Sequence, residues 1–386
     1  MAATEALRCD VAIVGAGPAG AALALRLARQ GRRVALLERS RFEQPRVGET
    51  LSPPVQGELR ALGVWDACLA LGPLPSWGTS SAWGDGELRS QSHLLSPWGC
   101  GWHVDREAFD RLLAHSAAAA GACLAEGAAA REWRHDGRHW WLRAGSTALR
   151  AKVLVDASGR SAHVARQLGA CRLMLDPLVG IAAAWRDVEE AQQHHLLVEA
   201  VPEGWWYSAP LPAPGAVRSM ITMLMTDADG CAAQQLQRAG PWHAALARAD
   251  ATRRRLSGAR AVAAPRVHVA QSQRLRRRQA STADGPWLAV GDAALAVDPL
   301  SGSGVLRALR QAAQAAEAVA GILDRPQCSV EVLAAYESAL DGECSRYLVE
   351  RAQQYGMEGR FETPFWRRRQ ARMPSLARPA GIEPAT

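Results

Sequence analysis

The sequence contains almost no lysine. Lys152 is the only one among its 45 lysine and arginine residues, so arginine carries the formal net charge of +7. The arginine clusters at 253–255, 274–278 and 367–369 are separate and match no nucleic-acid-binding fold signature. We therefore expect solvated surface arginines and no nucleic-acid partner. The alternative is an electropositive face that attracts an acidic cofactor or an acidic protein partner.

Paired cysteines and long apolar runs are also missing. The eight cysteines are scattered without a C-x-x-C pair, which argues against structural zinc and a disulfide framework and favours a reducing compartment. No apolar run is long enough to span a bilayer. The N-terminus passes directly into "RCDVAIVGAGPAG", without the basic and apolar regions of a signal peptide. These absences predict a cytoplasmic protein without stable membrane insertion.

Two kinds of catalytic motif are absent as well. The chain has no G-x-S-x-G nucleophile turn, so a serine-type triad is not expected. It also shows no metal-ligand spacing. His194 and His195 are adjacent, but neighbouring residues on a strand point to opposite faces and do not suit a single ion. We therefore expect no bound metal.

The chain does have the composition of a folded protein, with 386 residues of which 48% are hydrophobic. This length suits one large or two closely joined domains. Residues 10–40 predict a buried strand, a glycine turn, an apolar helix and a second strand. From 172 to 275, alternating segments such as "LLVEAV" and "VRSMITMLM" predict an antiparallel sheet, and an α/β pattern returns after it.

The first turn carries Gly15, Gly17 and Gly20 in G-x-G-x-x-G spacing. Because the turn follows a strand, opens a helix and precedes Glu38 by 18 residues, it predicts a dinucleotide site. Gly15 permits the tight turn, Gly17 lets the backbone approach a pyrophosphate, and Gly20 lets the helix pack on the strand. The helix N-terminus offers N–H groups to the phosphates, and Glu38 would accept hydrogen bonds from ribose hydroxyls.

Two further glycine loops follow, "DASGRSAHVAR" at 156–166 and "GDAALAVDPLSGSG" at 291–304. The order of G-x-G-x-x-G, glutamate, D-x-S-G-R and then G-D-A-A with D-P resembles the FAD-binding fold shared by aromatic hydroxylases, geranylgeranyl reductases and flavin-dependent halogenases. The resemblance covers roughly residues 9 to 350. It implies bound FAD and a mixed α/β (α+β) fold, in which an antiparallel-sheet substrate domain is inserted into a Rossmann-like FAD-binding domain.

The resemblance also implies which residues contact FAD. Asp292 would meet the ribityl and pyrophosphate portion. The segment after Asp298 would bring backbone N–H groups and a helix N-terminus to the pyrimidine edge, where reduced flavin carries its negative charge. Arg46 and Arg106 match positions that pack against FAD, with a solvated arginine as the alternative for each. The expected cofactor contacts are Gly15, Gly17, Gly20, Glu38, Arg39, Arg46, Gly48, Glu49, Arg106, Asp156, Gly159, Gly291, Asp292, Pro299, Gly302, Ser303 and Gly304.

These observations divide the chain into six segments. Three form the FAD-binding domain, the last of them with C-terminal helices, and two form the substrate domain. The final segment is basic and lacks a periodic pattern, so we expect it to be a disordered tail. In chain order the segments are 1–76 (FAD-binding), 77–104 (substrate-domain hairpin), 105–171 (FAD-binding), 172–275 (antiparallel substrate sheet), 276–356 (FAD-binding) and 357–386 (tail).

Three segments narrow the family branch. "PRVGETLSP", "GCGWHVDREAFD" and "GWWYSAPLP" resemble the halogenase-like branch, and particularly the flavoprotein maturases that oxidise tryptophan residues in quinone-cofactor enzymes. Halogenases have an essential lysine and a Trp-x-Trp-x-Ile-Pro segment near the flavin. Here residues 205–210 are "WWYSAP", and Lys152 lies just before the strand that leads to the Asp156 loop. Halogenase activity is therefore disfavoured.

Without that lysine, the resemblance implies direct oxygen transfer from a flavin C4a-hydroperoxide to an electron-rich ring. The protein's task is then placement, exclusion of water and stabilisation of charge. His103 is a candidate base for ring hydroxylation, and a structural histidine is the alternative.

Tryptophan is unusually frequent, with 14 tryptophans against four phenylalanines. Several lie in segments expected to border the substrate cavity, where they could clamp an aromatic substrate. For each of them, filling the core between the sheet and the FAD-binding domain is the alternative. The tryptophans concerned are Trp77, Trp83, Trp98, Trp102, Trp205 and Trp206. The candidate substrate-pocket residues are Trp102, Trp205, Trp206, Tyr207 and Pro210.

The sequence thus predicts an FAD-dependent monooxygenase that uses molecular oxygen to hydroxylate an aromatic ring. The maturase resemblance favours a tryptophan side chain in a protein or peptide. The alternatives are a small-molecule aromatic or indole hydroxylase, a geranylgeranyl-reductase-like flavin reductase, and a flavoprotein that only binds a partner. Electrons would come from transiently bound NADH or NADPH, or from a partner reductase.

Overall fold

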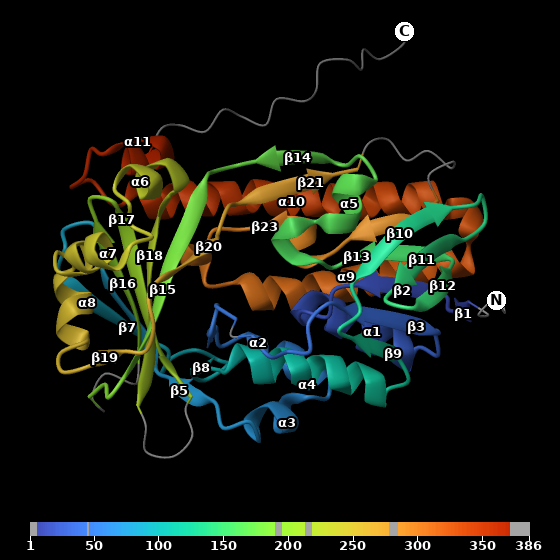
Figure 1. Cartoon of the computed structure of the whole chain (residues 1–386), viewed down its shortest axis with the longest axis horizontal. Coiled ribbons are helices and arrows are strands. Elements are labelled where there is room, and N and C mark those ends of the chain that lie inside the picture. Colours follow the sequence, from blue (N-terminus) through green and yellow to red (C-terminus); the bar gives the residue numbers. More distant parts are fainter. Residues whose placement is uncertain (1–5, 45, 190–194, 213–217, 278–284, 371–386) are drawn as a thin grey trace, which may run out of the picture.

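A computed structural model describes residues 6–44, 46–189, 195–212, 218–277 and 285–370. The mixed α/β class predicted from the sequence is confirmed. Figure 1 shows a large twisted sheet at the left and a parallel sheet flanked by helices at the right. The long helices α9 (Gly304–Asp324) and α10 (Ser329–Gly356) run lengthwise through the right-hand part. Among the residues described, no helix is both long enough and apolar enough to cross a membrane.

The parallel sheet has five short strands, in the order β22 (Trp287–Ala289), β13 (Val153–Asp156), β2 (Val11–Val14), β3 (Val34–Glu38) and β9 (Cys123–Glu126). All four pairings between them are parallel. Every side chain of β2 is buried, as expected for a parallel strand covered on both faces. Helices α1 (Pro18–Arg29), α4 (Arg106–Ala119) and α9 contribute to the same core.

The second large sheet has the order β19 (Arg260–Ala261), β15 (Leu178–Arg186), β18 (Ser219–Asp227), β17 (Gly204–Leu211), β16 (His195–Val201), β6 (Gly78–Ala82) and β7 (Leu88–Ser92), and β20 (Arg266–Val269) also pairs with β15. Only the pairing of β16 with β6 is parallel. One face packs against a layer of short helices, α6 (Ala228–Ala233), α7 (Ala239–Leu246) and α8 (Asp250–Arg255). The other face is turned toward the C-terminal segment and the large cavity described below.

The remaining strands form three smaller sheets. One sheet comprises β1 (Leu7–Arg8), β12 (Thr147–Ala151), β11 (Trp140–Ala144) and β10 (Ala130–His135). Two three-stranded sheets comprise β14 (Cys171–Met174), β21 (Gln273–Arg276) and β23 (Leu295–Ala296), and β4 (Thr50–Leu51), β8 (Gly101–His103) and β5 (Leu74–Ser76). The remaining helices are α2 (Val55–Ala61), α3 (Trp65–Leu69), α5 (His163–Gln167) and α11 (Pro364–Gln370).

The first part of the expected disordered tail is instead ordered. Residues 357–370 return to the large sheet, where α11 buries Phe365 and Trp366. Arg369 is also buried and forms an ion pair with Asp227 at 2.6 Å. The helix that carries the arginine run therefore also has an apolar face, formed by Phe365 and Trp366. This face packs beside Tyr355 in the core of the large sheet. Residues 371–386 lie outside the described part of the chain.

Candidate functional site

A cavity of about 1760 Å³ lies between the parallel sheet and the eight-stranded sheet. The three glycine loops predicted from the sequence line one side of it. Side chains of β16, β17 and β18 line the other side. The loops meet there because each follows the carboxyl end of a parallel strand, and these ends share one edge of the sheet.

The glycines of the first loop have different roles. A Cβ on Gly15 would overlap the carbonyl oxygen of Ala157, and its φ of +107° lies in the region that favours glycine. A Cβ on Gly20 would overlap the carbonyl oxygen of Gly15, so helix α1 could not approach the strand as closely. A Cβ on Gly17 would meet no protein atom within 4 Å, and Gly17 lines the cavity. The space in front of Gly17 is therefore left for a ligand.

Two helices begin at the cavity. Gly17 precedes α1 and Ser303 precedes α9, and neither residue caps its helix with a side-chain hydrogen bond. The first turns of both helices contain no acidic residue. The N–H groups at a helix start carry partial positive charge, so these two ends suit an anionic ligand.

Glu38 ends strand β3 and lines the cavity. Its carboxylate accepts hydrogen bonds from the Ala16 amide at 2.9 Å and from the Ser40 hydroxyl at 2.7 Å. Burial alone would raise the pKa of Glu38, but the hydrogen bonds from Ser40 and Ala16 outweigh it and hold the pKa below its ordinary value. The ionised carboxylate can accept a hydrogen bond from a ribose hydroxyl. Arg39, the next residue, also lines the cavity.

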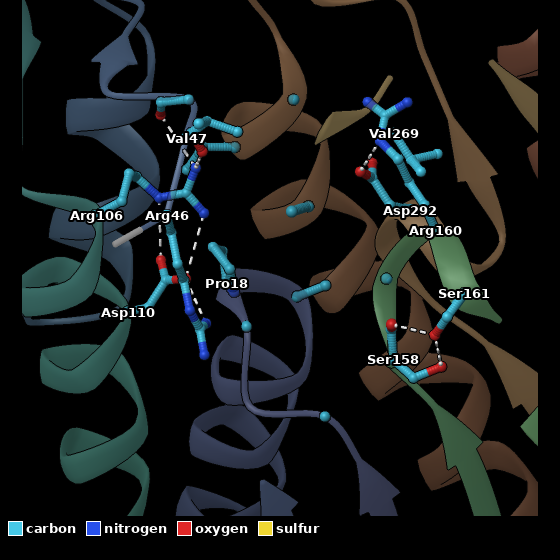
Figure 2. Close-up of a pocket in the computed structure, with 18 of the residues that line it drawn as sticks. Pro18, Arg46, Val47, Arg106, Asp110, Ser158, Arg160, Ser161, Val269 and Asp292 are labelled. Carbon is cyan, nitrogen blue, oxygen red and sulfur yellow. Dashed lines mark hydrogen bonds and ion pairs between the residues drawn. The ribbon is translucent and has the colours of Figure 1, made fainter. Parts of the chain in front are cut away.

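Figure 2 shows an arginine pair on one side of the cavity, with Pro18 of α1 beside it. Arg46 and Arg106 share the buried carboxylate of Asp110, at 2.8 and 3.1 Å. Arg106 also donates to the carbonyl oxygen of Gly48 at 3.0 Å. Arg46 also forms an ion pair with Glu38 at 3.6 Å. The two carboxylates hold both guanidinium groups at the cavity wall, where they can donate hydrogen bonds to a pyrophosphate.

Asp292 lies on the opposite side of the cavity (Figure 2). Its carboxylate forms an ion pair with Arg160 at 3.2 Å, and Arg160 also donates to the carbonyl oxygen of Val297 at 3.0 Å. Arg160 thereby ties the second glycine loop to the third. Gly159 lines the cavity, whereas Asp156 is buried behind it and accepts hydrogen bonds from Ser158 and the Ala165 amide.

The loop after Asp298 contributes the remaining predicted cofactor contacts. Asp298 is buried and accepts hydrogen bonds from the Leu300 amide at 2.9 Å and the Tyr355 hydroxyl at 2.7 Å. Gly302 has a φ of +57°, which ends the short turn and directs the chain into α9. The residues from this loop that line the cavity include Pro299, Gly302 and Gly304.

The opposite wall is the inner face of the eight-stranded sheet. Alternation along β17 places Trp205 and Tyr207 on this face. Trp206 faces the other way, into the helix layer, where its ring lies 5.1 Å from that of Trp242. Pro210 does not line the cavity either. The sheet residues that line it are Thr79, Leu196, Val198, Trp205, Tyr207, Met223, Met225, His268 and Val269.

Both cavity-facing aromatic residues of β17 are bonded to a group outside their own sheet. The Trp205 ring N–H donates to the Tyr355 hydroxyl at 2.9 Å, which in turn donates to Asp298. The Tyr207 hydroxyl donates to Oε2 of Glu49 at 2.5 Å. The substrate-side wall is thus connected to two of the loops that line the cofactor side.

The profile of the FAD binding domain family matches residues 8–349. The chain belongs to this family. It is 30% identical over 94% of its length to the putative FAD-dependent oxidoreductase LodB of Marinomonas mediterranea, 97% of which is covered. It is 27% identical over 92% of its length to a tryptophan 2-halogenase of Chondromyces crocatus, 69% of which is covered. The solved structure of the peptidyl tryptophan dihydroxylase QhpG matches with a TM-score of 0.76 and 29% identity, covering 96% of this chain and 80% of that one.

Several features of the cavity fit the FAD that this family binds. The open space before Gly17 and the two uncapped helix starts suit the pyrophosphate and the anionic edge of the flavin. Glu38 provides a carboxylate for the ribose. Five expected contacts do not line the cavity: Gly20, Glu49, Asp156, Gly291 and Ser303. Gly20 and Asp156 instead shape the loops, and the amide of Gly291 donates to Gln311 at 2.9 Å.

His103 and Trp102 lie outside the cavity lining. His103 is fully buried, and its Nδ1 lies 3.0 Å from the Thr50 hydroxyl. Burial, with a smaller effect of the Arg255 charge, lowers the pKa of His103 to about 3. The ring is therefore neutral at physiological pH. Trp102 packs edge-on against Trp65, with 5.5 Å between the ring centroids.

The remaining tryptophans named from the sequence also lie outside the lining. Trp77 and Trp98 are about half exposed at 47% each, and Trp83 packs against Trp366. The lone lysine, Lys152, forms a surface ion pair with Asp10 at 3.0 Å and does not line the cavity.

Sequence reasoning missed several residues of the site. Asp110 is four positions after Arg106 on a helix, and this i, i+4 spacing was a signal for the shared ion pair. Arg160 is part of the D-x-S-G-R motif itself. Met223 and Met225 have the same alternation as Trp205 and Tyr207, but no sequence pattern shows which face of a sheet is turned toward a cofactor.

Proposed function

We propose that this FAD-dependent oxidoreductase is a monooxygenase that hydroxylates an electron-rich aromatic ring, namely a tryptophan side chain held in a protein or peptide. The observation that carries the proposal is the cavity in which the three glycine loops lie opposite Trp205 and Tyr207. Support for the substrate class comes from the likeness to a peptidyl tryptophan dihydroxylase, at 29% identity over 96% of this chain.

Reduced FAD in such a site supplies the activation of molecular oxygen and its transfer to the ring. The chain's own residues bind, orient and exclude water. The N-terminus of α9 at Gly304 stabilises negative charge on the cofactor side. On the substrate side, Met223, Met225 and Trp205 provide an apolar surface that excludes water and contacts an aromatic ring by stacking or edge packing.

Halogenation is disfavoured because the cavity lining contains no lysine and Lys152 is paired with Asp10 on the surface. A small-molecule indole hydroxylase and a reductase of prenyl chains remain as alternatives with different products. For the electrons we propose NADH or NADPH, bound transiently, or a partner reductase. The cavity continues along the basic side chains of Arg166 and Arg172, a surface that suits an anionic donor.

The test uses the FAD-loaded protein, a tryptophan-containing polypeptide and a reductant, in air and under argon. The proposal predicts a product that has gained one oxygen atom per reaction in air and no product under argon. Mass spectrometry with peptide fragmentation locates the oxygen on the indole ring. A product reduced at a double bond in the absence of oxygen would support the reductase alternative instead.

A further inference from the structure

Glu49 and Tyr207 form a hydrogen-bonded pair across the two halves of the site. Tyr207, on β17, lines the cavity, and its hydroxyl donates to Oε2 of Glu49 at 2.5 Å. Glu49 precedes β4, is 2% exposed and lies behind the lining. The same oxygen accepts the amide of Gly48 at 3.0 Å. Glu49 was expected to contact FAD, but its carboxylate is directed at the substrate wall.

Burial makes the Glu49 carboxylate more basic and keeps the Tyr207 phenol neutral. Burial raises the pKa of Glu49, and the Tyr207 hydroxyl and the charge of Arg106 on α4 only partly offset this effect. Burial also raises the pKa of Tyr207 well above its ordinary value. Arg255 on α8 donates to the carbonyl oxygen of Ser208 at 3.0 Å, and its charge interacts with Tyr207. His103 on β8 contacts the neighbouring Thr50 but stays neutral. A neutral phenol therefore stands beside a carboxylate that is more basic than an exposed one.

We propose that Tyr207 and Glu49 form a proton-transfer pair that accepts the proton released when the aromatic substrate is hydroxylated. The inference rests on the proposed function. When a ring carbon has gained an oxygen atom from dioxygen, its C–H bond breaks and the electron pair returns to the ring. The proton passes to the Tyr207 oxygen, and the phenol proton passes to Glu49. The second oxygen atom leaves as water, using two electrons from the nicotinamide or reductase donor and two protons from that donor and the solvent.

The two residues have separate roles. We assign the catalytic role to Tyr207, because this residue lines the cavity and Glu49 does not. Glu49 is a positioning residue that acts through Tyr207. On β17, Trp205 cannot take this part, because its ring nitrogen is only a donor and is already bonded to Tyr355.

Three variants test the pair in the FAD-loaded protein. Tyr207→Phe removes the hydroxyl and Glu49→Gln removes the basic carboxylate. Tyr336→Phe is the matched control, because it removes a buried hydroxyl that donates to the carbonyl oxygen of Ala289 away from the pair. We expect Tyr207→Phe to slow product formation about 100-fold, the lower end for general base catalysis, while the rate of flavin reduction stays within two-fold. Reductant is then consumed with release of hydrogen peroxide, and the control couples as the wild type does.

The pH profile separates a catalytic from a structural role. The pair works only with Glu49 ionised, so the wild-type rate of product formation falls as pH is lowered through the raised pKa of Glu49. Glu49→Gln should lack this limb. Equal product formation in wild type and Tyr207→Phe, with unchanged pH profiles, would overturn the inference.

A second measurement does not depend on turnover. The chromogenic phenol 4-nitrophenol is bound to the FAD-loaded protein without reductant, and its visible absorbance reports its ionised fraction. We expect a larger ionised fraction in the wild type and Tyr336→Phe than in Tyr207→Phe and Glu49→Gln. If this holds but no tryptophan polypeptide is hydroxylated, the pair stands and the proposed function fails. An ionised fraction equal in all four proteins would overturn the pair itself.

Discussion

At the scale of single residues, Gly17 offers the cleanest test of the cofactor site. Its φ is in an ordinary region and a Cβ there would meet no protein atom within 4 Å. Gly17→Val should therefore fold normally yet lose FAD, because the added side chain occupies the space of the pyrophosphate. The flavin absorbance per protein and the melting temperature measure both effects.

The matched control is Gly240→Val, at another glycine with open space around it but outside the cavity. We expect it to retain FAD. Full occupancy of FAD in Gly17→Val would contradict the position of the cofactor.

His103 predicts a pH dependence of stability. Its pKa falls from 6.5 in the unfolded chain to about 3 in the folded protein because burial disfavours the charged ring. As pH falls below 6.5, the unfolded chain binds a proton that the folded protein does not, so stability decreases by about 1.4 kcal/mol per pH unit until the pH approaches 3. The slope of the free energy of unfolding against pH, measured by denaturant unfolding, gives the number of protons taken up on unfolding. This number should be smaller by one in His103→Gln than in the wild type.

The exposed His115 provides the control, because His115→Gln removes a histidine without touching the core. An unchanged slope in His103→Gln would mean that the ring is not buried and neutral. In that case His103 would again be a candidate for the base.

At the scale of elements, the two faces of β17 have different roles: one contributes to stability and the other lines the cavity. Trp206 fills the core between the sheet and the helix layer. Trp206→Ala should therefore lower the free energy of unfolding by about 3–5 kcal/mol. The protein that remains folded should keep the wild-type ratio of product formed to reductant consumed. Trp205→Phe should instead lower that ratio, because it alters the cavity wall and breaks the bond to Tyr355. Chemical denaturation and product analysis measure the two outcomes. Equal effects of both variants on coupling would contradict the orientation of β17.

The same strand shows what the sequence could predict. The sequence predicted a strand here and named Trp205, Trp206, Tyr207 and Pro210 together as pocket candidates, so residues of both faces were included. A strand has two faces, and only the tertiary arrangement of β17 between the helix layer and the glycine loops decides between them. The three glycine loops were easier to predict, since their backbone requirements are local. Their meeting follows from strand order in a parallel sheet.

Helix α11 is an element that the sequence did not predict. Its run of arginines suggested a solvated tail, yet Arg369 is buried against Asp227 and Trp366 is fully buried. A short helix gives too few residues for a periodic apolar pattern to be recognised. Trp366→Ala should therefore lower the free energy of unfolding by about 3–5 kcal/mol, measured by chemical denaturation. A change below 1 kcal/mol would contradict the packing of this helix on the large sheet.

At the scale of the whole molecule, the site exists only because two sheets face each other. The parallel sheet brings the cofactor loops and the eight-stranded sheet brings the aromatic wall, and the Glu49–Tyr207 and Asp298–Tyr355–Trp205 bonds join them. The sequence motifs predicted the three glycine loops of the cofactor half, although five of the expected contacts do not line the cavity. The substrate half could be predicted only as a sheet rich in tryptophan, and the cytoplasmic location stays a prediction.

The most direct test of the account is a reaction of the reduced, FAD-loaded protein with isotopically labelled dioxygen and a tryptophan-containing polypeptide. The account predicts one labelled oxygen atom on the indole ring for each pair of electrons consumed. Fragmentation by mass spectrometry would place the label. Unlabelled product, or consumption of oxygen that yields only hydrogen peroxide with every such polypeptide, would contradict a tryptophan monooxygenase.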